Sequence, residues 1–164
     1  MNDWLPALIK FNGDWPKYLE QIYAQFYQDF EVTKPKWSTG QRVSLKKHPK
    51  YDNKSATFWH MISEGHVEED RIPNIRRCER ISWLKVMMEK FDNKKPDQTS
   101  EVFWWKEKRG SEERFVISLT DFSYVLVVAD RGDYVLPWTA YLVEYNHQRK
   151  KLKSKYEQYW ALKG

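Results

Sequence analysis

Hydrophobic residues recur at three- and four-residue steps in two long stretches of the chain. Within residues 14–30 these positions fall on one helical face: Tyr18, Leu19, Ile22, Phe26 and Phe30. Residues 73–91 carry a second apolar stripe: Ile75, Cys78, Ile81, Leu84, Met88 and Phe91. Pro73 suits a first helical turn, because its missing N–H would have no partner there. We therefore predict a helix in the first stretch and one continuous helix across the second.

Four strand-like runs bounded by turn-rich pieces predict strands in the second half of the chain. The four runs are residues 102–106, 114–119, 124–129 and 134–143. Short, turn-rich pieces separate them, so we predict an antiparallel meander. Pro137 lies inside the last run, and because proline cannot donate to a neighbouring strand, we predict an edge position or a bulge there. Two further strands are predicted at residues 42–46 and 56–63, the latter with His60 on an apolar face.

The remaining element is a basic helix at residues 144–162, centred on HQRKKLKSK. Its apolar positions would let it pack on the sheet: Tyr145, Leu152, Tyr156, Tyr159 and Trp160. The sum is an α+β fold, an antiparallel meander sheet packed with an N-terminal, a central and a C-terminal helix. The length of 164 residues fits one domain. We divide it into a helical extension (1–40), a core (41–146) and the basic helix (147–164).

Composition narrows the choice of partners. The net charge of +5 favours polyanions such as RNA. The aromatic content of 16% either fills the core or offers rings on which unpaired bases stack. No apolar run approaches the length that crosses a bilayer, and the N-terminus lacks the features of a signal peptide, so we expect a cytoplasmic protein without a membrane partner.

The sequence has few of the motifs that bind cofactors or metal ions. The chain has 6 glycines and no Gly-rich phosphate loop, so we expect no nucleotide cofactor. Its single cysteine excludes an internal disulfide and a cysteine-based metal cluster. His60 and His66 with the nearby acids do not form a compact metal-binding pattern. We therefore predict no metal site.

Histidine is the natural proton shuttle near neutral pH, and His60 and His66 bracket a possible strand end. The alternatives are a half-buried core residue for His60 and an ordinary exposed residue for His66. Arginine forks match phosphate groups, and four arginines cluster around the start of the predicted central helix: Arg71, Arg76, Arg77 and Arg80. The alternative for these arginines is a solvated face neutralised by neighbouring acids.

The last predicted strand carries Thr139 and Tyr141 two residues apart, hence on one face. This pair could hold a phosphate or position an attacking hydroxyl; alternatively it is a packing pair. Arg114, which opens a neighbouring predicted strand, is a further candidate for the same face. Lys150 and Lys151 lie in the basic tail, which either grips a phosphate backbone or is an ordinary surface helix.

The segment FVISLTDFSYVLVVADRGDYVLPWTAYLVEY resembles the terminal meander of phage- and prophage-associated proteins of the barnase–EndoU–colicin–RelE-like nuclease group (BECR fold). The upstream ATFWHMI is similar to the strand in which these proteins place a histidine. The resemblance covers residues 41–146. It implies metal-independent RNA cleavage by 2′-hydroxyl attack, and an antitoxin or immunity protein as partner.

In that scheme His60 matches the family histidine as general acid or base. Thr139 and Tyr141 match the hydroxyl-bearing last strand, and either Arg80 or Arg114 would stabilise the charged phosphorane. The leading hypothesis is a metal-independent endoribonuclease, as the toxin of a toxin–antitoxin or phage-related system. The alternatives are a non-catalytic RNA- or DNA-binding protein, and a phage or prophage factor that binds a host protein.

Overall fold

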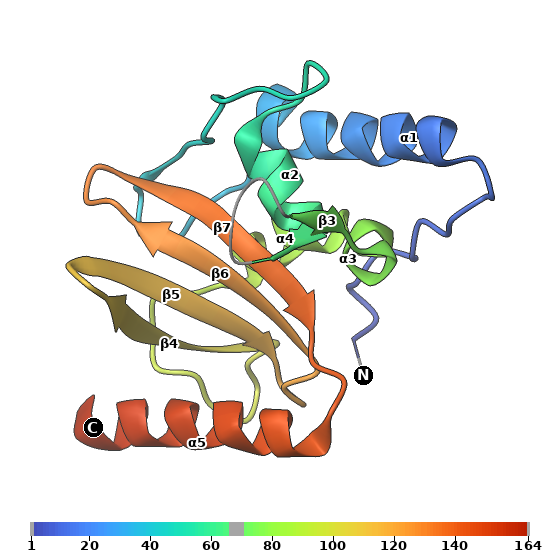
Figure 1. Ribbon diagram of the computed structural model, residues 1–164. Helices are drawn as coiled ribbons and strands as arrows, with labels where there is room; N and C mark the ends of the chain where they lie inside the picture. The colour runs from blue at the N-terminus through green and yellow to red at the C-terminus, as the bar shows by residue number, and fades with distance from the viewer. Residues whose placement is uncertain (1, 66–70, 164) are drawn as a thin grey trace.

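A mixed five-stranded sheet lies between a group of helices and the single C-terminal helix in this computed structural model, which describes residues 2–65 and 71–163 (Figure 1). The fold is α+β, as predicted. The elements are α1 (Trp15–Tyr27), a π-helical turn η1 (Gln28–Val32), β1 (Arg42–Val43), α2 (Ala56–Ile62), β2 (Ser63–Glu64), β3 (Ile72–Pro73), α3 (Ile75–Glu79), α4 (Trp83–Lys90), β4 (Val102–Arg109), β5 (Glu112–Leu119), β6 (Tyr124–Asp130), β7 (Tyr134–Leu142) and α5 (Asn146–Lys163).

The predicted meander is confirmed, because β4, β5, β6 and β7 pair antiparallel with their sequence neighbours. Strand β1 adds to β7 in parallel through two residues only, so it is shorter than predicted. The pairing of β6 with β7 shifts register beside Pro137: Val127 pairs with Thr139, whereas Val128 pairs with Pro137. Trp138 is therefore the extra residue of a bulge, which confirms the prediction made from the proline.

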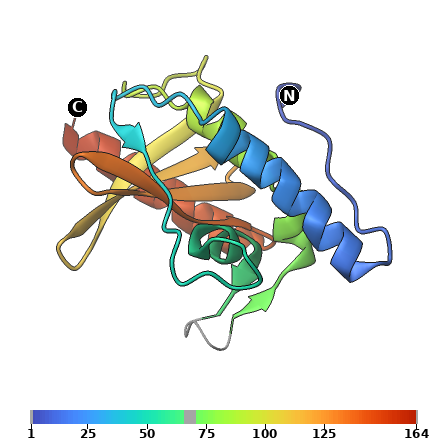
Figure 2. The same cartoon turned by 90° about the horizontal axis from the view of Figure 1, so that it is seen from above.

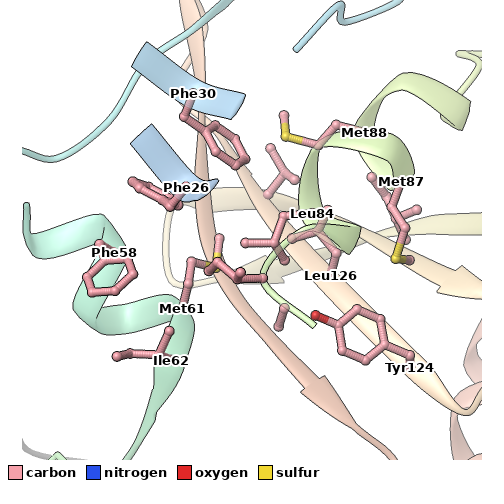
Figure 3. Packing of buried hydrophobic residues seen from close by; sticks show 14 of the residues in the cluster. Phe26, Phe30, Phe58, Met61, Ile62, Leu84, Met87, Met88, Tyr124 and Leu126 are labelled. Atoms are coloured by element: carbon pink, nitrogen blue, oxygen red, sulfur yellow. The ribbon is translucent and has the colours of Figure 1, made fainter. Parts of the chain in front are cut away.

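One face of the sheet carries the main hydrophobic core. Helix α1 lies along this face and contributes the stripe predicted for it, including fully buried Tyr18 and Phe26. Figure 3 shows side chains of α2, α4 and β6 meeting there, with Met61, Leu84 and Leu126 at the centre. Each large apolar side chain buried in this way stabilises the fold by about 1.5–3 kcal/mol. The N-terminal helix thus shares one core with the sheet.

Helix α5 packs against the opposite face, and Figure 2 shows it on the far side of the sheet from α1. Its Leu152, Tyr156 and Tyr159 contact a second, smaller hydrophobic cluster, as predicted. Trp160 donates its indole N–H to the backbone carbonyl of Trp104, at 2.6 Å, on edge strand β4. The helix therefore protects an edge that would otherwise be open to pairing.

The strand predicted at residues 56–63 is wrong, because residues 56–62 form helix α2. The Ser55 side chain caps this helix by accepting a hydrogen bond from the Phe58 backbone N–H. Phe58, Met61 and Ile62 all point into the core, at helical spacing. The helix is short and buried on nearly every side, so its apolar residues do not show the polar face that identifies a longer helix.

The continuous helix predicted from Pro73 to Phe91 is also wrong. Pro73 lies in β3, and Asn74 begins the short helix α3 by accepting a hydrogen bond from the Arg77 backbone N–H. A turn at Arg80–Ser82 then separates α3 from α4. The apolar stripe is nonetheless buried from Cys78 onward, because the turn redirects the chain without removing it from the core. Within the described residues, no helix is long and apolar enough to span a membrane.

Candidate functional site

A cavity of about 410 Å³ lies between α3, the end of β7 and α5. It adjoins a smaller hollow of about 150 Å³ on the sheet face under α5, and three residues line both: Tyr141, Leu152 and Lys155. We call the two together the basic groove. Its walls come from elements far apart in sequence, namely α3, β7 and α5, and Figure 1 shows α3 and α5 on different sides of β7.

The charges around the basic groove are unbalanced. Among the described residues, its cationic lining side chains are Arg76, Arg77, Arg109, Arg114, Lys151 and Lys155. Its acidic ones are Glu64, Glu107 and Glu144. The excess of positive charge in a concave surface concentrates the potential and attracts anions. The groove therefore suits a phosphate-bearing ligand.

Arg77 connects three elements at the wall of this groove. Its Nη1 donates to the backbone carbonyl of Ser63, where α2 ends, and to Thr139 Oγ1 on β7, at 3.3 Å. Burial lowers the pKa of its guanidinium, and the carboxylate of Glu64 acts in the opposite direction. Because an arginine ordinarily loses its proton only far above neutral pH, the group stays charged near neutral pH. A fixed cation therefore stands beside the Thr139 hydroxyl.

Tyr141 follows Thr139 on the same face of β7, as the two-residue spacing predicts. Burial raises the pKa of its phenol, so the phenol stays protonated and can donate a hydrogen bond. Arg114 lines the same hollow; its guanidinium lies 5.1 Å from the Trp138 ring centre and pairs with Glu112 at 2.8 Å. The structure thus brings Thr139, Tyr141, Arg77 and Arg114 to one surface.

His60 occupies a different position from the one expected. It lies on helix α2, is 8% exposed, and its ring centre stands 5.0 Å from that of Trp138 on β7. The residue lines a neighbouring cavity of about 530 Å³ and does not line the basic groove. Ser63 lines that cavity too, and its carbonyl contacts Arg77. His60 and the groove are therefore neighbours joined through Ser63 and Trp138.

Two other predicted residues lie apart from the groove. Arg80 is turned inward: it donates to the backbone carbonyl of Arg76 at 3.0 Å, contacts Glu79, and covers the ring of Trp83. Lys150 is exposed on α5 and does not line the groove, whereas its neighbour Lys151 does. Arg80 therefore holds α3 against α4. Arg77 instead lies beside the hydroxyl-bearing strand β7, where Arg80 was expected.

Two candidate residues remain, Arg76 and His66. Arg76 lines the groove, and its exposed side chain pairs with buried Glu79 at 3.5 Å. His66 lies outside the described residues. Within the described ranges, no cluster of three or more side chains could hold a metal ion.

Comparisons with protein-family models, curated proteins and solved structures found no match for this chain.

Two residues at the basic groove and its boundary, Arg109 and Trp138, were not predicted from the sequence. Arg109 ends β4 and reaches the groove only because β4 continues beyond the predicted strand end at residue 106. Trp138 stands between His60 and Arg114 because it is the extra residue of the bulge. The neighbouring Pro137 was the available signal, since bulges redirect side chains.

Arg77 bridges Ser63 and Thr139, so we predict that replacing it lowers the stability of the protein even when the positive charge is kept. Substitution Arg77→Lys keeps the positive charge but loses the planar fork that reaches Ser63 and Thr139 together. We expect the free energy of unfolding to fall by about 1–3 kcal/mol, measured by urea denaturation. The matched control Arg76→Lys, on the exposed neighbour, should change it by less than about 0.5 kcal/mol. Equal effects of the two substitutions would contradict the bridging role.

Proposed function

We propose that this protein binds single-stranded RNA in the basic groove and cleaves it without a metal ion. The observation that carries the proposal is the placement of Arg77 beside the Thr139 hydroxyl, with Tyr141 and Arg114 on the same surface. Arginine forks and hydroxyl donors together match the oxygens of a phosphodiester. The adjoining positive charge of α5 would hold the phosphates on either side.

Cleavage would proceed by attack of the ribose 2′-oxygen on the neighbouring phosphorus. The new O2′–P bond forms as the P–O5′ bond breaks, leaving a 2′,3′-cyclic phosphate and a free 5′-hydroxyl. The 2′-hydroxyl gives its proton to His60, and the leaving 5′-oxygen takes a proton from water. The resulting hydroxide and the protonated His60 then neutralise each other. Arg77, with Arg114, would stabilise the charge that builds on the phosphorane oxygens.

The resemblance of the C-terminal half to BECR-fold nucleases supports the same activity. It also leads us to propose a toxin whose activity an antitoxin or immunity protein restrains. The residue assignment differs from the family expectation at one point, since Arg77 replaces Arg80 as the arginine nearest the hydroxyl-bearing strand. Thr139 and Tyr141 keep the roles that the resemblance implies.

A second candidate, RNA binding without cleavage, is favoured by one observation. His60 is 8% exposed and does not line the basic groove, so a bound phosphate would reach it only through a shift of either partner. The binding surface would be the same in both cases. The two candidates therefore differ in the fate of the RNA.

Cleavage is tested with a 5′-labelled single-stranded RNA in the presence of EDTA. We expect shorter products that end in a 2′,3′-cyclic phosphate, identified by mass spectrometry. The substitution His60→Gln should lower the rate at least about 100-fold, as the loss of a proton-transfer group does. The control His147→Gln, on exposed α5, should cleave at the wild-type rate. Intact RNA with the wild-type protein would exclude the nuclease and leave the binding candidate.

Binding is tested by the salt dependence of RNA affinity. Each phosphate contact contributes a slope of about −0.7 to log K against log salt for single strands. The double substitution Lys151→Ala and Lys155→Ala removes two groove cations, so we expect a slope shallower by about 1.4. The matched control, Lys150→Ala with Lys153→Ala, removes two exposed charges of the same helix that do not line the groove. Equal slopes for the two variants would place the RNA elsewhere.

A further inference from the structure

The cavity beside the basic groove has a different chemical character. Its volume is about 530 Å³, within the range of ligand-binding sites. Three aromatic side chains line it, from α1, the loop before α2, and α2 itself: Trp15, Tyr51 and Trp59. Lys50, Arg71 and His60 supply its basic groups, and none of its described lining residues is acidic. We call it the aromatic cavity.

Two of the rings form a fixed corner. The centres of Tyr51 and Trp59 lie 5.6 Å apart, with their planes at 80°. The indole N–H of Trp59 donates to the backbone carbonyl of Tyr51 at 2.9 Å, which fixes the orientation of the indole. The Tyr51 side chain is 72% exposed, so its ring is available to a ligand. A flat aromatic ligand could stack on one ring and place its edge against the other.

The two-stranded ribbon of β2 and β3 places this cavity directly beside the basic groove. Ser63 and Pro73, which pair with each other, line the aromatic cavity. The next residues, Glu64 and Asn74, line the groove. The Ser63 carbonyl accepts the hydrogen bond of Arg77, so the two spaces meet at that contact. One nucleotide could therefore reach into both.

We propose that the aromatic cavity binds one unpaired base of the RNA, and that the adjoining phosphate lies at Arg77 in the basic groove. This inference rests on the proposed binding of RNA. The chemistry matches on both sides: stacking on Tyr51 and Trp59 suits the base, and Lys50 and Arg71 suit an anionic backbone. The ribose between base and phosphate would then lie at His60, where the proposed proton transfer takes place.

The probe is an RNA trinucleotide whose first and central residues lack the 2′-hydroxyl, so that neither of its phosphodiesters can be cleaved. A second probe has the same backbone but no central base. We expect the base to tighten binding at least about fivefold, the lower limit for stacking of one base, measured by tryptophan fluorescence. Tyr51→Ala should bring this ratio close to one, and Tyr51→Phe, which keeps the ring, should preserve it.

The control is Tyr27→Ala, at an exposed tyrosine about 18 Å along α1 from Trp15, which should leave the ratio unchanged. Equal affinity of the wild type for the two probes, or a ratio that survives Tyr51→Ala, would overturn the base site. Cleavage of ordinary RNA is measured in parallel. If RNA is cleaved but the base does not tighten binding, the base site in the aromatic cavity is refuted and the nuclease proposal stands. If the base tightens binding but RNA is not cleaved, the nuclease proposal is refuted and the base site stands.

Discussion

The guanidinium of Arg77 joins parts of the molecule that are far apart in sequence, since one of its partners, Thr139, lies 62 residues after Arg77. On one side it donates to Ser63, where helix α2 ends, and on the other to the hydroxyl of Thr139 on β7. Because it is partly buried and remains charged, it fixes the distance between the small ribbon of β2 and β3 and the sheet. Both the basic groove and the aromatic cavity have that contact at their boundary.

The bulge in β7 completes this arrangement. Trp138, the extra residue, contacts His60 on one side and Arg114 on the other, so it links the aromatic cavity with the sheet side of the groove. Helix α5 closes the groove from the opposite side and adds Lys151 and Lys155. A polyanion with a flat base therefore meets cations, hydroxyl donors and aromatic rings within one continuous region. In our account the protein uses this region to bind and cleave RNA.

The meander, the bulge and the packing of α5 could be predicted from the sequence, because short strand-like runs, the turns between them and Pro137 are local signals. Helix α2 was missed because it is short and buried on nearly all sides, which removes the polar face. The position of Arg80 could not be read from the sequence either, because the turn after α3 directs Arg80 inward and leaves Arg77 at the groove. Proximity of His60 to β7 depends on tertiary packing, which no local pattern reports.

The central claim is that RNA occupies the basic groove and the aromatic cavity together. The most direct measurement follows the tryptophan indole N–H signals by NMR while an uncleavable RNA trinucleotide is added. Our account predicts that Trp59, in the aromatic cavity, and Trp138, between the two spaces, shift together and saturate at one affinity. Trp83, whose indole donates to the Pro6 carbonyl, should not move. Unchanged signals of Trp59 and Trp138 at saturating RNA would contradict the account.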